Sequence, residues 1–482
     1  MEVRFSSKDQ IRAWHSELRG SFDSGITLDV KFRKRELQQL TYLLQDNVEQ
    51  ITEAIRKDLG RSHFESVFAE IMVTTNLAIE AYTNVDAWSK SQSRWAGLVW
   101  ALHSPTEHKE PKGTVLIIGA WNYPISVQIG PLIGALCAGC TAILKPSEIA
   151  FHSAQLLAKL WPQYMDSRMS RVITGGVEET TELLDLRWEH IFYTGNSRVG
   201  KIVAEKAARG LCPTTLELGG KSPVFIHESA NLSIAAHRLM WAKSINCGQT
   251  CIAPDYVLCN KHLQDQLIEE LRKAYIKFWP NGARLSKDYG RIINDQQFSR
   301  LEHIVENTKG SIIIGGKRDA KTRFLEPTVI KDPPSDDISM SEEIFGPILP
   351  IITVDGVDEG CAFVNGRDQP LALYIFAKRK ISDFIIHKTK SGGVVQGDLM
   401  VHYVVCPLSF GGIGLSGYGA YHGRAGFETF SHTRSSIHAP ATGMLGRAVE
   451  WLMASRYPPY SDLKLKLLTM LLGKNRPFGR PS

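Results

Sequence analysis

Short apolar runs that alternate with helical stretches set the strongest limit on how this chain folds. From Gly113 onward, runs of three to five mostly apolar residues are each followed by a segment with helical spacing; the runs are Thr114–Ile118, Thr141–Leu144, Arg171–Ile173, His190–Tyr193 and Thr215–Leu218. Strands that alternate with helices in this way predict a parallel, doubly wound sheet. In such a sheet ligands bind beyond the carboxyl ends of the strands, so the residues after each run are the candidates for a site.

A second series of the same kind covers roughly residues 223–405, and its runs are Tyr256–Cys259, Ser311–Ile314, Ile348–Ile352, Leu373–Phe376 and Gly393–Val395. Apolar residues at three- and four-residue spacing predict helices from residue 8 to about residue 100. We therefore expect an α/β protein with two doubly wound, Rossmann-like domains. The expected divisions are residues 1–214, 215–420 and a small closing element, 421–482.

Composition excludes several classes of protein. A length of 482 residues, with 43% hydrophobic and 22% charged residues, is typical of a globular protein with more than one packed unit. The net charge of +6 comes without a basic stripe interleaved with aromatics, so nucleic-acid binding is not expected. No apolar signal region is visible, and no run approaches the roughly 20 apolar residues of a membrane span. Eight cysteines without a signal predict free thiols in a cytoplasmic protein that is not secreted.

One cysteine lies in a context that favours reactivity. Cys251 ends the segment Asn246–Cys251, just after a glycine-containing turn. A cysteine there can be exposed and its thiolate stabilised by backbone N–H groups, although an inert core cysteine and a metal pair with Cys247 are alternatives. Cys137 and Cys140 form a C-x-x-C motif, but no partner His or Cys follows at zinc-like spacing. No metal site is therefore expected.

The segment Gly195–Lys201 follows a predicted strand and opens a predicted helix, where helix N-terminal amides can hold a phosphate. It nearly matches the phosphate-binding loop G-x-x-x-x-G-K-[ST], but Ile202 stands where the magnesium-binding hydroxyl is needed. It also departs from G-x-G-x-x-G, because Ser197 occupies the position of the middle glycine. Taken alone, the segment leaves a dinucleotide site and an ordinary glycine-rich turn both open.

Further polar groups stand at strand ends or in loops. Glu217 lies between two leucines, where burial would raise the pKa of its carboxyl toward the range of a general base. Asn122 and Glu343 occupy strand-end or loop positions, and Lys145–Glu148 comes directly after a predicted strand. Each group has an ordinary structural interpretation by itself. Their occurrence together, in this order, favours one catalytic site.

These segments resemble the aldehyde dehydrogenase superfamily, and most closely its class 3 branch, which includes fatty aldehyde dehydrogenases. The resemblance covers roughly residues 10–460, and its motifs are Trp121–Pro124, Leu144–Glu148, Tyr193–Ser197, Leu216–Pro223, Gly248–Tyr256, Glu342–Pro350, Ser409–Gly412 and Tyr421–Gly423. The sequence departs from the family pattern at Ala120, where proline is usual, and at Gly397, where class 3 enzymes usually have asparagine. The second departure lies where a substrate funnel would open, so it bears on specificity more than on chemistry.

The resemblance implies a covalent mechanism. Cys251 would attack the aldehyde carbon to give a thiohemiacetal and, after hydride transfer, a thioester; Asn122 would stabilise the oxyanion and Glu217 would activate the hydrolytic water. Tyr123 and Phe410 would line the substrate pocket. The expected substrates are medium- or long-chain aliphatic aldehydes or other apolar aldehydes. A catalytically inactive NAD-binding protein of the same fold is the alternative, and it should lack one of the three catalytic residues, which are all present here.

The resemblance also implies a cofactor, NAD with NADP also accepted, and a homodimer with residues 421–482 as the oligomerisation segment. The implied cofactor contacts are Lys145, Glu148, Gly195, Ser197, Gly200, Glu343 and Phe345. Lys145 and Glu148 would hold the adenosine ribose, and Glu343 the nicotinamide ribose. An acidic Glu148 near the ribose 2′-hydroxyl favours NAD, because a 2′-phosphate would meet a like charge.

The C-terminal tail carries an amphipathic pattern. Leu463, Leu467, Met470 and Leu471 recur at helical spacing, with lysines on the remaining face. Such a helix can pack on its own subunit or on the partner, and a peripheral contact with a membrane through residues 461–480 is the alternative. Fatty-aldehyde members of the family carry a C-terminal helix over the substrate funnel. The resemblance therefore suggests that residues 461–472 cover the funnel and favour long apolar aldehydes.

Overall fold

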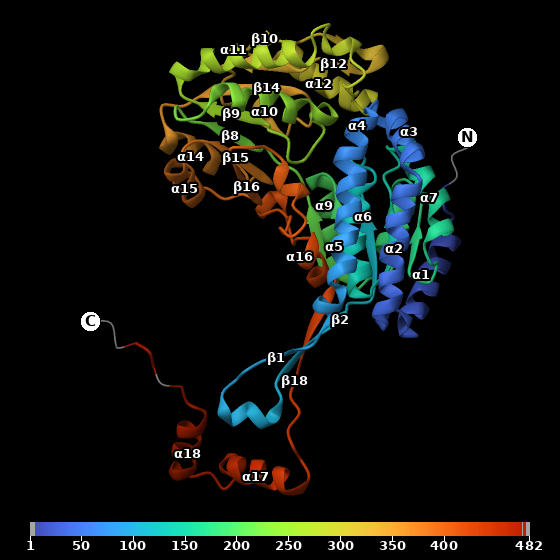
Figure 1. Ribbon diagram of the computed structural model, residues 1–482, viewed down its shortest axis with the longest axis vertical. Helices are drawn as coiled ribbons and strands as arrows, with labels where there is room; N and C mark the ends of the chain where they lie inside the picture. Colours follow the sequence, from blue (N-terminus) through green and yellow to red (C-terminus); the bar gives the residue numbers. More distant parts are fainter. Residues whose placement is uncertain (1–4, 475, 479–482) are drawn as a thin grey trace. The chain divides into compact units, whose positions relative to one another are not determined.

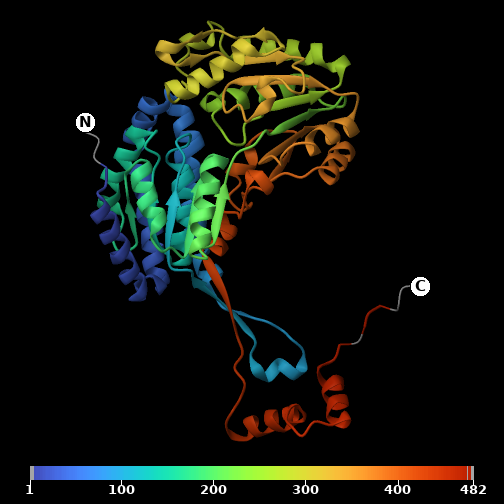
Figure 2. The ribbon, with the colours of Figure 1, turned by 180° about the vertical axis from the view of Figure 1, so that it is seen from behind.

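The computed structural model describes residues 5–474 and 476–478, and the chain divides into two compact units (Figures 1 and 2). The first unit carries both large sheets, and the second combines two segments that are far apart in the sequence. The first comprises Met1–Val85 and Pro111–Phe430, and the second Asp86–Glu110 and Ser431–Ser482.

Five helices open the chain, as the apolar spacing predicts: α1 (Lys8–Asp23), α2 (Val30–Asp46), α3 (Val48–Leu59), α4 (His63–Ser66) and α5 (Met72–Ser89). The Ser7 side chain caps α1 by accepting the N–H of Gln10, and α3 ends at Gly60, whose φ of 62° lies in the left-handed region. A five-residue π-helical turn, η2 (Val67–Ile71), separates α4 from α5. Such turns occur frequently at functional sites.

The first sheet has six strands in the order β17-β7-β6-β3-β4-β5 (Figure 1). They are β3 (Thr114–Ile118), β4 (Thr141–Lys145), β5 (Ser170–Val172), β6 (His190–Thr194), β7 (Thr214–Glu217) and β17 (Gly417–Tyr418). All are parallel except β17, which pairs antiparallel with β7 at the edge. The chain moves outward from β3 to β5 and then crosses to β6 and β7, which confirms the predicted doubly wound sheet.

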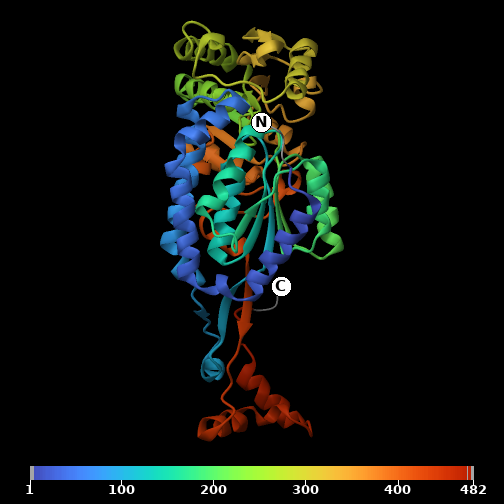
Figure 3. The same cartoon turned by 90° about the vertical axis from the view of Figure 1, so that its right-hand side faces the viewer.

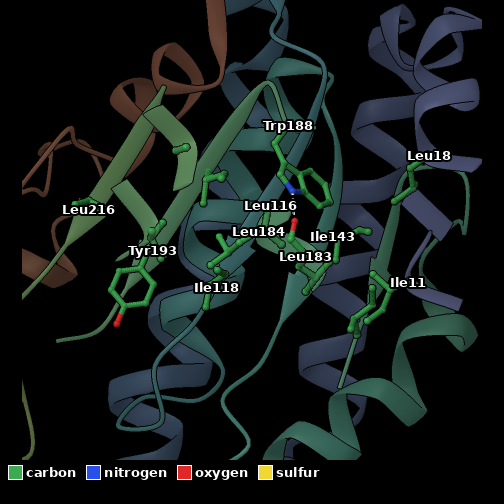
Figure 4. Close-up of a cluster of buried hydrophobic side chains, with 14 of the residues drawn as sticks. Ile11, Leu18, Leu116, Ile118, Ile143, Leu183, Leu184, Trp188, Tyr193 and Leu216 are labelled. Carbon is green, nitrogen blue, oxygen red and sulfur yellow. Dashed lines mark hydrogen bonds between the residues drawn. The ribbon is translucent and has the colours of Figure 1, made fainter. Parts of the chain in front are cut away.

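Helices cover both faces of this sheet (Figure 3). One face carries α6 (Ser126–Ala138) and α7 (Phe151–Tyr164), and the other carries α1, α8 (Val177–Asp185) and α9 (Ser197–Arg209). The core on the second face is a cluster of fully or nearly fully buried side chains from the sheet, α1, α8 and α9 (Figure 4); it includes Ile11, Leu116, Ile143, Leu183, Trp188 and Val203. This burial of aliphatic side chains fixes the strand ends that carry the site.

The second sheet has seven strands in the order β10-β13-β14-β9-β8-β15-β16. They are β8 (Pro223–Ile226), β9 (Tyr256–Cys259), β10 (Ser311–Ile314), β13 (Thr328–Lys331), β14 (Ile348–Thr353), β15 (Ala372–Phe376) and β16 (Gly393–Gln396). Only the edge strand β10 runs antiparallel. The accompanying elements are α10 (Leu232–Ser244), α11 (Lys261–Phe278), α12 (Asp295–Asn307), α13 (Ile338–Ser341), α14 (Val357–Asn365), α15 (Arg379–Lys388) and the short hairpin β11 (Arg318–Asp319) and β12 (Phe324–Leu325). The predicted pair of doubly wound α/β sheets is thereby confirmed.

The candidate residues lie at opposite ends of the strands in the two sheets. Lys145 and Glu217 are the last residues of β4 and β7, at carboxyl ends of the first sheet. Cys251 and Glu343 instead precede β9 and β14, at amino ends of the second sheet. The expectation that site residues follow the strands therefore holds for the first sheet and fails for the second.

Within the described residues, the second unit has a three-stranded sheet, in the order β1-β2-β18, and two α-helices. Its elements are β1 (Gln92–Ser93), β2 (Thr106–Pro111), β18 (Ser431–Ser436), α17 (Gly443–Met453) and α18 (Asp462–Leu472); α16 (Gly423–Thr429) belongs to the first unit. His108 Nε2 and Ser436 Oγ lie 2.8 Å apart, and Lys109 donates to Thr433 Oγ1 at 2.8 Å.

This arrangement differs from the expected domain divisions. Residues 86–110 were expected within the first division, 1–214, with helices as far as about residue 100; after α5 ends at Ser89 they instead contribute β1 and β2 to the second unit. The closing element was expected to begin at residue 421, and it begins at Ser431. The reason is that β2 pairs with β18, a strand from the opposite end of the chain, and local periodicity carries no signal for such a pairing.

The predicted C-terminal amphipathic helix is α18, and none of its side chains is buried. Leu463 and Met470 are 68% and 75% exposed. Among the described residues, no helix combines the length and the apolar character needed to cross a membrane.

Candidate active site

Cys251 follows a tightly wound turn between α10 and β9. Asn246, Cys247 and Gly248 have φ angles of 50°, 52° and 69°, which makes three consecutive left-handed residues. Asparagine and glycine adopt this conformation readily, but Cys247 does so at a cost that surrounding contacts must offset. A Cβ at position 248 would lie 2.3 Å from the carbonyl oxygen of Gly346, so the turn requires glycine there.

Buried side-chain amides hold this turn in place. Gln249 Nε2 donates to the carbonyl oxygens of Asn246 at 2.9 Å and Arg291 at 3.1 Å, and its Oε1 accepts the N–H of Ile293 at 3.0 Å. Asn246 Nδ2 in turn donates to the carbonyl oxygen of Gln249 at 2.9 Å. The backbone that presents Cys251 is therefore fixed by hydrogen bonds that water cannot reach.

Cys251 lines an apolar cavity. The cavity also contains Glu217, Tyr123 and Phe410, three further residues that the sequence predicts for the site. Most of the remaining wall is apolar and comes from both sheets and their loops, for example Phe68, Val127, Trp241, Ile252, Met400 and Tyr421. The fold thus brings a cysteine and a carboxyl group from different sheets into one apolar space.

The cavity holds Cys251 as a thiol. Burial, together with the nearby carboxyl groups of Glu343 and Glu217, raises the pKa of the Cys251 thiol to about 12. The N–H groups of Cys251 and Ile252 act in the opposite direction, because they hydrogen-bond to the sulfur. At neutral pH the sulfur therefore needs a base before it can act as a nucleophile.

Glu217 is the carboxyl group that lines the same cavity as Cys251. Its side chain is 3% exposed, and neither carboxyl oxygen has a hydrogen-bond partner among the described residues. Burial raises the pKa of Glu217 well above 4.5. Its backbone is held by strand pairing with Gly417 and by the N–H of Gly195, which donates to its carbonyl oxygen at 3.0 Å. The backbone of Glu217 is thus fixed at the end of β7, while its carboxyl lies in the cavity with a raised affinity for a proton.

Asn122 lies against the residues that precede Cys251. Its Nδ2 donates to the carbonyl oxygen of Gln249 at 3.1 Å, and the neighbouring Tyr123 hydroxyl lies 3.0 Å from Thr250 Oγ1. Asn122 is 3% exposed, so its amide is shielded from bulk water. A carboxamide in such surroundings can stabilise an oxyanion without first reorganising solvent.

The structure adds three residues that the sequence did not single out for a role. Arg61, Glu70 and Asn246 are all buried and hydrogen-bonded to the segment around Asn122. In the sequence, Arg61 and Glu70 have the pattern of ordinary surface charges in a helical region, so a single sequence does not predict that they are buried. The sequence did offer a signal for Asn246. Asparagine tolerates a left-handed backbone, and Asn246 lies two residues before Gly248 in the motif that ends at Cys251.

The predicted cofactor residues of the first sheet lie along the carboxyl ends of its strands. Lys145 Nζ donates to Glu148 Oε2 at 2.8 Å. Ser197 is the first residue of α9, whose N-cap Asn196 accepts the N–H of Val199 at 3.0 Å. An ammonium group and a helix N-terminus at the same edge of the sheet suit a ligand that carries phosphates and hydroxyl groups.

Two glycines at this edge of the first sheet are required for steric reasons. A Cβ at Gly195 would lie 2.2 Å from the Tyr193 hydroxyl, and one at Gly200 would lie 2.9 Å from Leu218 Cδ2. Gly200 therefore allows α9 to pack closely on the sheet, which is the part that the last glycine plays in dinucleotide-binding turns.

Glu343, which precedes β14 of the second sheet, places its carboxyl against Gly219. A Cβ at Gly219 would lie 2.0 Å from Glu343 Oε2, and the Gly220 N–H hydrogen-bonds to the carboxylate. Burial raises the pKa of Glu343 to about 8, and the nearby carboxylate of Asp255 adds to that rise. Gly219 thus makes room for the Glu343 side chain, and Gly220 binds it through its N–H.

Phe345 is placed differently from the other aromatic candidates. Its ring meets that of Trp121 edge-on, with 5.3 Å between centroids, and its φ of 48° is left-handed. The cavity lining contains Tyr123 and Phe410 but, within the described part of the chain, not Phe345. Phe345 therefore supports the loop that carries Asn122 from the outside of the cavity.

Comparison with known proteins identifies the family of the chain. The model of the aldehyde dehydrogenase family matches residues 1–436. The chain belongs to that family. The mouse protein named aldehyde dehydrogenase family 3 member A2 is 42% identical over 464 residues, which cover 96% of this chain and 94% of the mouse protein. This agreement confirms the resemblance to class 3 enzymes drawn from the motifs.

Two further relatives bear on the assignment. The rat protein named aldehyde dehydrogenase, dimeric NADP-preferring is 42% identical over 442 residues, which cover 92% of this chain and 96% of the rat protein. A solved structure of the substrate-bound state of Staphylococcus aureus AldH superposes with a TM-score of 0.91 and 36% identity, covering 98% of this chain and 100% of the other. This aldehyde dehydrogenase thus shares both sequence and fold with its relatives along nearly its whole length.

Proposed function

We propose that this aldehyde dehydrogenase oxidises apolar aldehydes, of medium or long aliphatic chain, to carboxylic acids with NAD or NADP. The observation that carries the proposal is that Cys251 and Glu217 line the same apolar cavity. A nucleophile and a base within one water-poor space are what oxidation through a thioester requires. The printed name of the rat relative supports a nicotinamide cofactor, and the apolar wall supports an apolar substrate.

The first half of the reaction forms a thioester. The Cys251 sulfur bonds to the aldehyde carbon while its proton moves to Glu217, and the carbonyl oxygen becomes the oxyanion of a thiohemiacetal. The Asn122 amide and the Cys251 N–H stabilise this oxyanion, each donor contributing typically about 2.7–4 kcal/mol. When bound, the nicotinamide supplies the hydride acceptor, and the acyl group then remains on the Cys251 sulfur as a thioester.

The second half hydrolyses that thioester. Glu217, after losing the first proton to solvent, removes a proton from a water molecule whose oxygen attacks the acyl carbon. The carbon–sulfur bond breaks, the carboxylic acid leaves, and Cys251 takes up a proton again. The absence of hydrogen-bond partners for the Glu217 carboxyl within the described chain suits both proton transfers, since no competing donor holds its oxygens.

The residues at the strand ends fit a dinucleotide. Lys145 and Glu148 would hold the adenosine ribose, and Glu343 would hold the nicotinamide ribose. Gly195, Ser197 and the N-terminal amides of α9 would face the pyrophosphate, whose charge the helix dipole favours. The close approach of α9 to the sheet at Gly200 supports this assignment.

A spectrophotometric assay tests the proposal. Purified enzyme with NAD or NADP should increase the absorbance at 340 nm on adding aldehydes, and kcat/KM should rise with chain length because each methylene buried in the cavity contributes about 0.8 kcal/mol. Turnover without any chain-length preference would contradict the apolar substrate class. No turnover on any aldehyde would favour an inactive NAD-binding protein instead.

The exposed apolar side chains of α18 support a role in substrate choice. We expect that ending the chain after Pro459 lowers kcat/KM on long-chain aldehydes roughly tenfold more than on short ones, an effect equal to about two methylene groups losing their burial. The measurement is the assay above, carried out on both forms of the enzyme. Equal losses on long and short aldehydes would exclude a covering role for residues 461–472.

The second unit also supports two proposed associations. A homodimer fits the word dimeric in the name of the rat relative and the exposed Trp95 and Trp451 of this unit. A peripheral membrane contact through residues 461–480 fits the unburied apolar side chains of α18. Asn475, Gly479 and Arg480 of that segment lie outside the described residues.

Glu148 should influence the choice of cofactor. We expect Glu148→Gln to raise kcat/KM for NADP relative to NAD by about tenfold, because removing one like charge near a 2′-phosphate relieves a repulsion of about 1–4 kcal/mol. Initial rates with each cofactor at several concentrations give the ratio. The control is Glu182→Gln, which removes a carboxylate of α8 that pairs with Arg12 of α1, and it should leave the ratio unchanged. An unchanged ratio in Glu148→Gln would place the ribose elsewhere.

A further inference from the structure

Arg61 is a fully buried arginine that joins three separate segments of the chain. It follows α3, and both its side chain and that of Glu70 are 0% exposed. Its Nη1 donates to Glu70 Oε1 at 2.5 Å, its Nη2 to the carbonyl oxygen of Asn122 at 2.5 Å, and its Nε to Asn246 Oδ1 at 3.1 Å. The guanidinium also lies 4.5 Å from the ring centroid of Tyr123.

Glu70 extends this contact to the other end of the same loop. Its second oxygen, Oε2, accepts the N–H of Ile125 at 2.8 Å and of Ser126 at 3.1 Å, where α6 begins. Arg61 holds the carbonyl at residue 122, while its partner Glu70 holds the amides at residues 125 and 126. The ion pair therefore spans the whole loop that carries the proposed oxyanion donor.

Asn246 connects the same carbonyl group to the turn before Cys251. Its Nδ2 donates to the carbonyl oxygen of Asn122 at 2.9 Å, and its N–H donates to Glu65 Oε2 at 3.1 Å. The Asn122 carbonyl oxygen thus accepts two donors, one from Arg61 and one from a residue five positions before the nucleophile. Its position is fixed relative to both.

A gain in folding stability does not by itself explain the buried ion pair between Arg61 and Glu70. Removing two charges from water is costly, and well-packed apolar residues of similar volume often stabilise a protein as much or more. A planar guanidinium can reach three acceptors in fixed directions, which neither lysine nor an apolar side chain can do. The arrangement is therefore suited to setting an orientation.

We propose that Arg61, held by Glu70, is a positioning residue that orients the Asn122 carboxamide toward the oxyanion. The inference rests on the proposed role of Asn122. The hydrogen bond from Arg61 to Asn122 goes to the backbone carbonyl oxygen, so Arg61 acts on the reaction through the direction in which the Asn122 side chain leaves the loop. A small misorientation of a catalytic group far from a substitution can cost about 100-fold in rate.

A double-mutant cycle on the full-length enzyme tests this inference. Single-turnover NADH formation is measured for Arg61→Lys, Asn122→Ala and the double variant, together with their melting temperatures. Arg61→Lys is expected to slow hydride transfer by about 10- to 100-fold, and Asn122→Ala by about 100- to 1,000-fold. The double variant should be no more than about twofold slower than Asn122→Ala, because residues that share one function are not additive. Arg61→Lys should lower the melting temperature equally in both backgrounds.

The outcomes separate the inference from the function on which it rests. Full additivity of the two rate losses, or no loss in Arg61→Lys, would overturn the positioning role of Arg61. Hydride transfer in Asn122→Ala as fast as in the unmodified enzyme would overturn the role of Asn122 itself. Should Arg61→Lys fail to fold, Glu70→Gln replaces it in the cycle with the same expectation, since it removes the charge that holds the guanidinium.

A matched control is available elsewhere in the first unit. Arg33 on α2 is 5% exposed and also donates to backbone carbonyl oxygens, those of Thr27 and Cys137. Arg33→Lys should lower the melting temperature but leave the rate of hydride transfer within about twofold, because the carbonyl groups of Thr27 and Cys137 that Arg33 holds belong to neither the Asn122 loop nor the turn before Cys251. A rate loss in Arg33→Lys as large as that in Arg61→Lys would reduce the effect to general destabilisation and overturn the proposal.

Discussion

Replacing Cys251 with serine should lower aldehyde-dependent NADH formation by on the order of 1,000-fold or more, as is typical when a covalent nucleophile is removed. Cys251 lines the apolar cavity, and the backbone amides of Cys251 and Ile252 hydrogen-bond to its sulfur. A serine hydroxyl is a far weaker acid than a thiol, and in this buried setting Glu217 could not deprotonate it to a useful extent. Steady-state rates at 340 nm with saturating NAD and aldehyde give the comparison.

The control for this result is a cysteine of similar accessibility that lies away from the cavity. Cys212 is partly buried, in the connection between α9 and β7, and its Sγ hydrogen-bonds to the backbone of Pro213 and Ile191. Cys212→Ser should keep nearly full activity. Residual activity above about one tenth in Cys251→Ser, with an unchanged melting temperature, would show that another group is the nucleophile.

Replacing Glu217 with glutamine should slow steady-state turnover by about 100- to 10,000-fold, the range for loss of a general base. An amide of the same shape can take the proton neither from the Cys251 thiol nor from the hydrolytic water. Both halves of the reaction should therefore slow. A stopped-flow trace at 340 nm should show that the first turnover of NADH formation is slowed together with the steady state.

The pH dependence follows from the environment of Glu217. Burial raises the pKa of its carboxyl well above 4.5, so in the wild-type enzyme the base is protonated and inactive at low pH. kcat should therefore rise with pH through the raised pKa, and this rise should disappear in Glu217→Gln. A pH profile of the variant with the same rise as the wild type would assign the titrating base to another residue.

Stability provides an independent check with the opposite sign. A carboxyl whose pKa is raised on folding stabilises the folded state fully below its unfolded pKa near 4.5, and this contribution is lost as pH rises through the folded value. Glu217→Gln removes that loss, so the variant should be at least as stable as the wild type at alkaline pH. Glu36→Gln is the matched control, because burial raises the pKa of Glu36 to about 7 on α2, outside the cavity lining.

The sequence by itself determined the fold class and the family. Strand β9, Tyr256–Cys259, and strand β3, Thr114–Ile118, occur with the predicted bounds, because a fully buried strand must be a short apolar run whatever surrounds it. Glycines were informative for a similar reason. Gly200 and Gly248 are required by contacts within a few ångströms, so the motifs that contain them are readable without a structure.

The tertiary structure alone decided where charged residues and distant strands meet. Arg61 and Glu70 look like solvated helix charges in the sequence, and only the fold encloses them against the Asn122 loop. Strand β2 pairs with β18, and β17 joins the edge of the first sheet beside β7, although neither partner is near in the chain. Periodicity reports which face of a segment is apolar, but not which segment will cover that face. Pairings and buried charges depend on that second choice, which is made only when the whole chain packs.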